Sequence, residues 1–129
     1  MKTKFLEALK EDHKRVYGTE SEIEKLLRKN DFIKKFKLIL DMSEMEYDHD
    51  LDNYDSLNIY PITYGSFALE IYGFEFELEY CTDGKLYMTM NDYADLQPKS
   101  EELFSLLHLL LDHIELDIKA FEVLAKLKD

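Results

Sequence analysis

Residues 67–80 read FALEIYGFEFELEY, and this stretch decides the fold of the chain. From Phe67 to Ile71 apolar side chains occupy every second position, a period typical of a β-strand with one buried face. After Gly73 the phase slips by one position, and alternation resumes at Phe74. One extra residue in a strand produces a bulge, where glycine is common, so a bulged strand is our first interpretation. The alternative is a sharp turn between two separate strands.

Further strands are predicted on both sides of this stretch. Residues 58–64 are rich in Ile, Thr and Tyr, and Gly65-Ser66 is a candidate two-residue hairpin turn. Asp83-Gly84 is the strongest turn signal in the chain, and it precedes an alternation of Leu86, Met88 and Met90. Together these segments predict an antiparallel meander.

Helical patterns lie at the two ends of the chain. Residues 2–16 carry an apolar stripe at three-to-four spacing, and Gly18 is a suitable stop. Thr19 to Glu22 fits a capping box at the start of a second helix. From Ser100 to Ala125 apolar residues again recur at helical spacing, which predicts one long helix or two with a bend near Asp117.

Residues 32–42 fit both a helix and a strand. We expect a strand from about Phe36, because polar residues occupy the alternate places at Lys35, Lys37 and Asp41. The expected fold is therefore one α+β domain, residues 1–129, with N-terminal helices, an antiparallel meander of four to five strands and a long C-terminal helix packed on one sheet face.

Size and composition restrict the class of protein. A chain of 129 residues with 46% apolar and 34% charged residues is globular, and it buries roughly two thirds of its unfolded surface. Cys81 is the single cysteine, which excludes a disulfide framework and favours the reducing cytoplasm. We also expect no secretory signal, because no basic start with an apolar core and cleavage site is present.

Charge is distributed unevenly around the formal net value of −12. Residues 1–40 have a net charge of +4, residues 41–102 of −14 and residues 103–129 of −2. Such acidity repels nucleic acid and anionic membranes and attracts a basic partner. Acidity that only maintains solubility is the alternative explanation.

Eight of the nine tyrosines lie in the same acidic region, between residues 47 and 93. Tyrosine is a good strand residue, and that explains most of them. It does not explain Tyr47 and Tyr54, which lie among aspartates in a polar stretch, residues 43–57, that we expect to be a loop. Tyrosine also supplies large, stiff contact area at binding surfaces.

No motif establishes a metal site or an enzymatic reaction. Asp48, Asp50 and Asp52 match the first three ligands of an EF-hand calcium loop, but Asn53 replaces the required glycine and Ile59 the final glutamate. A solvated acidic loop is the better interpretation. The two histidines nearest each other, His108 and His113, are five apart and point about 140° away from each other on a helix.

Catalytic groups are not predicted either. No sequence neighbour supplies a base for Cys81, and no nucleotide-binding or acyl-transfer fingerprint occurs. Glu75, Glu77 and Glu79 share one strand face, so their environments should be alike, whereas acid and base roles need different ones. We therefore predict no enzymatic activity, no cofactor and no metal.

The combination of acidity and tyrosine predicts a protein that binds a basic protein partner, because charge accelerates encounter and aromatic anchors slow release. In size, charge and arrangement the chain resembles the small acidic immunity proteins that neutralise nuclease toxins. It is also similar to phage-encoded acidic inhibitors of nucleic-acid enzymes. The partner-binding residues that we predict are Glu75, Glu77, Glu79, Tyr47, Asp48, Asp50, Asp52, Tyr54 and Asp55.

Two other classes stay open on the sequence alone. A homodimer or assembly subunit would pair the C-terminal apolar stripe, which includes Leu110, with its copy. A metal-binding or enzymatic module would use the loop of residues 48–55.

Overall fold

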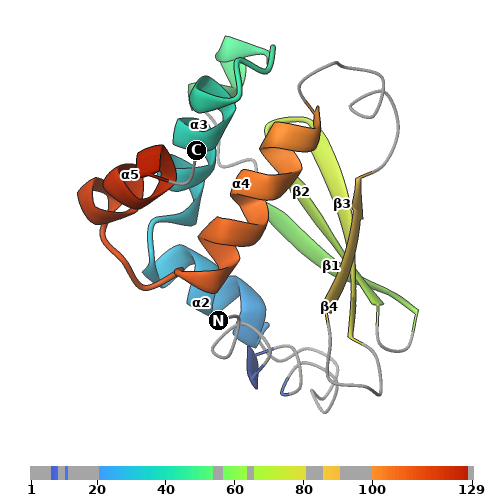
Figure 1. Ribbon diagram of the computed structural model, residues 1–129. Coiled ribbons are helices and arrows are strands. Elements are labelled where there is room, and N and C mark those ends of the chain that lie inside the picture. The colour runs from blue at the N-terminus through green and yellow to red at the C-terminus, as the bar shows by residue number, and fades with distance from the viewer. Residues whose placement is uncertain are drawn as a thin grey trace.

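The computed structural model describes residues 7–8, 11, 21–53, 57–63, 66–80, 86–90 and 100–127. Figure 1 shows helices on one side of the molecule and a sheet on the other. In chain order the elements are α2 Glu22–Lys29, α3 Phe32–Met42, the 3-10 helix η1 His49–Asn53, β1 Asn58–Thr63, β2 Ser66–Ile71, β3 Phe74–Tyr80, β4 Leu86–Met90, α4 Ser100–Asp112 and α5 Ile118–Leu127.

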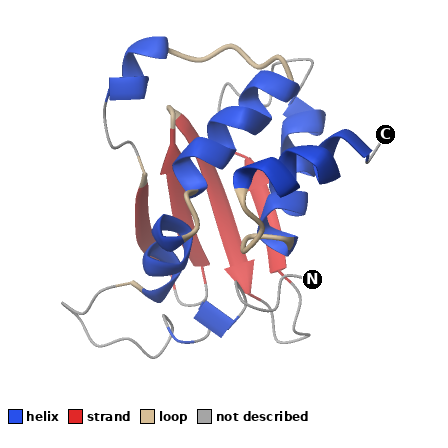
Figure 2. Cartoon of the chain, turned by 90° about the vertical axis from the view of Figure 1, so that its left-hand side faces the viewer, coloured by secondary structure: helices blue, strands red, loops and turns tan. Residues whose placement is uncertain are grey.

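The strands form an antiparallel sheet in the order β1-β2-β3-β4, so consecutive strands are neighbours throughout. Seen from the helix side, the helices lie in front of the strands and cover one sheet face (Figure 2). The fold class predicted from the sequence, α+β with helices on one face of a meander, is confirmed. The core lies between the two layers, with side chains such as Phe36, Phe76 and Leu107 fully buried.

The β2–β3 connection is a turn, so our first interpretation of a bulge at Gly73 is wrong and the alternative of two strands is correct. Tyr72 and Gly73 form a two-residue connection with φ of 51° and 81°. Positive φ at both positions is the mark of a type I′ hairpin turn. A bulky residue rarely adopts positive φ. The Tyr72 ring is held there by stacking against Phe36, with ring centroids 6.4 Å apart and planes 8° from parallel.

Two other predictions concern turns at the ends of strands. Ser66 is not a turn residue, because it lies in β2 and pairs with Thr63. Asp83-Gly84 and the Gly65 of the first hairpin lie outside the described residues.

Residues 32–42 form helix α3, so the strand predicted from Phe36 is wrong. A strand would bury every second residue, whereas the buried apolar set is Phe32, Phe36, Ile39 and Leu40, which recurs at helical spacing. Leu38, which the strand pattern places with Phe36, is only half-buried. The lysines do not mark the outer face of a strand, because Lys35 is itself buried in the helix whereas Lys34 is exposed.

Helix α2 begins two residues later than the capping box at Thr19 predicted. Ser21 is the N-cap, and its hydroxyl accepts a hydrogen bond from the Glu24 amide at 3.1 Å. The sequence Ser21-x-x-Glu24 is itself a capping-box pattern, so the motif was right in kind and wrong in position. Of the helix predicted at residues 2–16, the described residues 7–8 and 11 are helical and the rest lie outside the described part.

The C-terminal stripe forms two helices, α4 and α5, with the break next to the predicted position at Asp117. Asp117 caps α5, because its carboxylate accepts the Ala120 amide at 2.7 Å. Lys35 of α3 binds the segment between α4 and α5. Its side chain is buried, and Nζ donates a hydrogen bond to the Ile114 carbonyl at 2.9 Å. Burial lowers the pKa of Lys35, while Asp31 and Asp117 act against that shift.

The apolar stripe of α4 and α5 packs within the chain itself. Leu103, Leu107, Leu110 and Phe121 are all fully buried. Among the described helices, none has the length and apolar character needed to cross a membrane.

Candidate functional site

The sheet face turned away from the helices carries a row of carboxylates. Glu75, Glu77 and Glu79 alternate along β3 with the buried residues Phe74, Phe76 and Leu78, so they point to the outer face, as predicted. In Figure 1 this face lies on the side of the strands opposite α3, α4 and α5, and no helix drawn as a ribbon covers it. Glu75 and Glu77 are half-buried and Glu79 is exposed.

A fourth glutamate, Glu70 on β2, joins this row directly opposite Glu75. The Ile71 and Phe74 pair closes the two-residue turn and is therefore hydrogen-bonded, so the next pair, Glu70 and Glu75, is non-hydrogen-bonded. Side chains of such pairs approach most closely, with Cα atoms about 4.5 Å apart. Like charges directly opposite each other destabilise a sheet.

Two of these carboxylates, those of Glu70 and Glu77, accept hydrogen bonds from neutral hydroxyl groups. The Tyr60 hydroxyl donates to Glu70 Oε1 at 2.6 Å, and Ser66 Oγ donates to Glu77 Oε1 at 2.9 Å. The hydrogen bond to Glu70 raises the pKa of Tyr60 to about 12, with further contributions from desolvation and from the Glu75 charge. No lysine or arginine lies on this face among the described residues of the four strands.

Tyrosines flank the glutamates on the two outer strands. Tyr60 on β1 lies opposite Ala68, and Tyr87 on β4 lies opposite Glu79. These two residues are 36% and 49% exposed. We call the set of Tyr60, Glu70, Glu75, Glu77, Glu79 and Tyr87 the acidic face.

The acidic segment that contains Tyr47, Asp48 and Asp50 has other contacts than this face. The Tyr47 ring lies 4.5 Å from the His49 ring and 5.4 Å from the Tyr72 ring, and its hydroxyl oxygen is buried. Tyr47 is therefore packed against the core. Asp48 directly precedes η1, and its carboxylate accepts a hydrogen bond from the Asp50 amide at 3.0 Å. This is a local capping role that needs no partner.

The structure separates the loop from the glutamates. η1, the short green helix at the top of Figure 1, lies beyond the end of α3 on the helix side of the sheet, and Figure 2 places it at the same end. Glu75, Glu77 and Glu79 are brought together, whereas Tyr47, Asp48 and Asp50 do not join their face. Asp52 lies in η1. Tyr54 and Asp55 lie outside the described residues.

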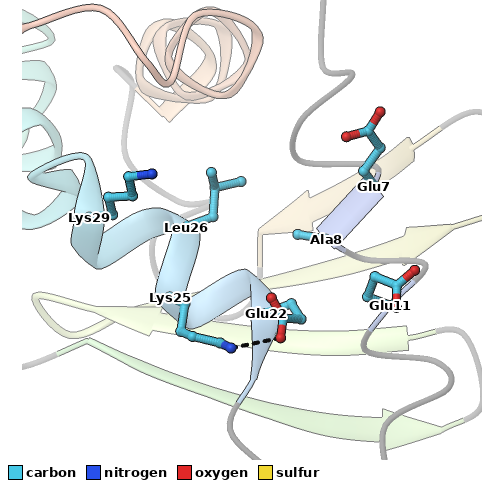
Figure 3. A pocket seen from close by; sticks show the side chains of 7 residues that line it. All are labelled: Glu7, Ala8, Glu11, Glu22, Lys25, Leu26 and Lys29. Carbon is cyan, nitrogen blue, oxygen red and sulfur yellow. Dashed lines mark ion pairs between the residues drawn. The ribbon is translucent and has the colours of Figure 1, made fainter.

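A groove of about 310 Å³ lies between residues 7–11 and α2 (Figure 3). Its lining is mixed in charge and contains Glu7, Glu11, Glu22, Lys25 and Lys29. Lys25 Nζ forms an ion pair with Glu22 at 2.7 Å, and both side chains are 45% exposed. Exposed, mutually neutralising charges of this kind supply neither a nucleophile with its base nor a metal-ligand set.

The remaining candidates from the sequence are a metal site and the catalytic groups His13 and Cys81. Among the described residues no group of three or more His, Cys, Asp or Glu side chains is arranged to hold a metal ion. His13 and Cys81 lie outside the described residues. Comparison of the chain with protein-family models, with curated proteins and with solved structures finds no match.

Sequence reasoning missed Glu70, Tyr60 and Tyr87 as members of this face. The signal was present in the turn: with Tyr72-Gly73 as a two-residue connection, Glu70 necessarily pairs with Glu75. The same register, continued across the sheet, places Tyr60 and Tyr87 on the outer side.

Proposed function

We propose that this chain is an acidic inhibitor of the immunity-protein type, acting in the cytoplasm on a cationic nuclease toxin or another nucleic-acid-binding enzyme by covering its basic site. The observation that carries the proposal is the acidic face: four glutamates on two neighbouring strands, with no described cation among them. Folding alone gives no reason for this arrangement, since opposite like charges destabilise a sheet. Binding of a cationic surface gives one.

Spacing supports the same partner class. Side chains two apart on a strand repeat every 6.8 Å or so, which makes Glu75, Glu77 and Glu79 a regular row of negative charges. A nucleic-acid strand also presents its negative charges at regular intervals, and enzymes that bind it line their sites with Lys and Arg. A row of carboxylates on a rigid sheet competes for those cations without having to order a loop first.

Aromatic side chains complete the proposed interface. Tyr60 and Tyr87 offer partly exposed rings on either side of the carboxylates. Charge complementarity raises the association rate, whereas buried aromatic contacts slow dissociation. A toxin inhibitor needs both, because it must bind before the enzyme acts and must stay bound.

The homodimer alternative is less well supported. Most of the stripe on which it depends is buried in the chain's own core, Leu110 included. Among the described helices α5 retains exposed large apolar side chains, at Ile118, Val123 and Leu127, and exposed apolar residues are common on monomers. The phage-type variant uses the same acidic face and differs only in the identity of the enzyme that is bound.

Affinity capture with matched variants tests the proposal. The immobilised chain is incubated with host lysate at 50 mM NaCl, eluted at 1 M NaCl, and the eluted protein is assayed for nuclease or nucleic-acid binding with and without added chain. The face variant carries Glu75→Lys, Glu77→Lys and Glu79→Lys. The control, which we call the loop variant, carries Asp41→Lys near the end of α3, Glu46→Lys in the segment that follows and Asp50→Lys in η1, three exposed positions with an identical change in net charge.

We expect a basic protein whose nucleic-acid activity is inhibited by the wild-type chain and by the loop variant, but not by the face variant. Equal inhibition by both variants would remove the acidic face from the proposal. Capture of no basic, nucleic-acid-acting protein would refute the inhibitor function itself.

A further inference from the structure

The two edges of the sheet differ in their capacity to accept another strand. β1 and β4 are the edge strands, at opposite ends of the strand order. Among the described residues β4 pairs only with β3. An edge strand presents a row of backbone N–H and C=O groups to which another chain can pair, unless proline, charge or irregularity prevents it.

The register shows which residues present those groups. The Ile71 and Phe74 pair is hydrogen-bonded across the type I′ turn, so alternation along β3 directs the backbone groups of Glu77 and Glu79 towards β4. Their partners Thr89 and Tyr87 are thereby satisfied. The N–H and C=O of Met88 consequently point to the outer edge of β4.

The same alternation, continued across β2, sets the direction of the backbone groups of β1. It directs the backbone groups of Tyr60 towards β2 and leaves the nitrogen of Pro61 on the outer edge. Proline lacks an N–H and occurs in strands at such outward positions. The inferred phase therefore agrees with the placement of Pro61.

Within the described residues, β1 has features that block an added strand and β4 has none. The β1 edge lacks a donor at Pro61 and is irregular between Pro61 and Thr63. The Arg28 guanidinium also binds the Leu57 carbonyl beside it at 3.2 Å. β4 contains neither proline nor a charged residue from Leu86 to Met90, so its own sequence supplies none of these protections.

Charge indicates what kind of strand fits this edge. A strand added beside β4 places its outer side chains next to Tyr87 and Thr89, about 10 Å from Glu79 and Glu77 on β3. Long cationic side chains span that distance to the carboxylates, whereas short or acidic ones do not. An extended segment with Arg or Lys at alternate positions is therefore complementary to this edge.

We infer that an extended basic segment of a protein partner adds to the β4 edge as a fifth strand, with alternate Arg or Lys side chains directed to Glu77 and Glu79. The inference rests on the proposed function and specifies how the partner is held. Backbone pairing at Met88 supplies a fixed register, and the carboxylates select the basic sequence.

The probe is a nine-residue peptide in which arginine alternates with valine, with a glutamate-for-arginine peptide as its control. Binding to the wild-type chain is followed by titration calorimetry, and amide hydrogen exchange by NMR. Met88→Pro removes the outward N–H on β4. Ile59→Pro is the matched control, because the same alternation turns its N–H outward on β1 and the two side chains are similarly buried, at 7% and 9% exposure.

Binding of the arginine peptide should slow exchange of the Met88 amide at least tenfold and leave the Thr89 amide, already paired with β3, much less changed. Met88→Pro should weaken binding by about tenfold or more and Ile59→Pro by less than twofold, since only the former removes a pairing donor. Should Met88→Pro not fold, the exchange measurement on the wild-type chain still decides the outcome.

Each contrary result has a separate meaning. Salt-sensitive binding that Glu77→Lys with Glu79→Lys abolishes, without slower Met88 exchange, would overturn strand addition and retain the acidic face as the binding surface. Equal binding of both peptides, or none at millimolar concentration, would overturn strand addition, and the capture assay would then decide the inhibitor function alone. Concentration-dependent protection of Met88 without peptide would name a second copy of the chain as the occupant.

Discussion

Neutralising Glu75 should make the protein more stable, because Glu75 faces Glu70 across the β2–β3 hairpin. In Glu75→Gln the shape of the side chain is kept and the like-charge contact is removed. The Tyr60 hydroxyl still has the Glu70 carboxylate as its acceptor at 2.6 Å. We therefore expect the electrostatic change to dominate over any change in packing.

The magnitude follows from the pair geometry. Carboxylates on directly opposite residues of a non-hydrogen-bonded pair lie on the order of 6 Å apart, and in a water-like dielectric their repulsion is about 0.7 kcal/mol. Measured cross-strand charge pairs fall in the same range, about 0.2–1 kcal/mol. At 1 M salt the screening length shortens to about 3 Å, which removes most of that repulsion.

Urea denaturation at 20 mM and 1 M NaCl measures the effect. Glu75→Gln should raise the free energy of unfolding by about 0.5 kcal/mol at low salt, with an unchanged m value, and by much less at high salt. Glu79→Gln is the matched control, since Glu79 lies on the same strand and face but opposite Ser66. It should change stability by less than half as much.

A stability gain that is absent at low salt, or that is equally large at 1 M NaCl, would refute this reasoning. So would an equal gain from Glu79→Gln, because the effect would then belong to net charge and not to the opposed pair.

Three further predictions concern titration and packing. The pKa of Tyr60, raised to about 12, should appear as a late phase of ultraviolet phenolate titration that Tyr60→Phe removes; because the folded chain keeps this proton longer, stability should fall as pH rises from 10 to 12. The pKa of Lys35 is lowered from 10.5 by burial, so the unfolded chain binds more protons below 10.5 and stability should rise as pH approaches that value; Lys35→Met should reduce this slope in denaturation measurements between pH 8 and 10. Leu110→Ala should destabilise the chain by about 2–5 kcal/mol in urea denaturation without changing its mass in light scattering, because Leu110 is fully buried in its own core.

The fold class could be predicted because alternation and helical spacing report directly on which face is buried. Glu75, Glu77 and Glu79 were correctly placed on one strand face for that reason. Helix α3 was mispredicted because eleven residues with lysines at alternating places satisfy both periods. Only the tertiary contact of Lys35 with Ile114, 79 residues away, explains why a lysine is accepted on the buried side.

The extent of the acidic face depended on register, which the sequence specified only through the turn. With a bulge at Gly73, Glu70 and Glu75 lie on one continuous strand; with a type I′ turn they lie opposite each other. The positive φ of Tyr72 is unusual for an aromatic residue and is held by stacking on Phe36, a contact between α3 and the hairpin. The sequence around Gly73 does not indicate that contact, so a turn at this position was only the alternative to a bulge.

Tyr47 shows that the direction of a side chain in a polar segment is hard to predict from the sequence. A tyrosine among aspartates was interpreted as a surface anchor, yet its ring packs on Tyr72 and His49. Acidic neighbours in sequence can all point outward while one aromatic residue turns inward to close the core. The direction of a loop side chain depends on what packs beneath it, and here that is the β2–β3 turn.

The most direct test of the central claim is the salt dependence of partner affinity for the face variant and the loop variant, which have equal net charge. With the captured basic partner, titration calorimetry between 50 and 300 mM NaCl should give a steep loss of affinity for the wild-type chain and the loop variant. The face variant should bind weakly at every salt concentration. Parallel salt curves for the two variants would show that overall charge, and not the glutamates of β3, attracts the partner, and would contradict the account.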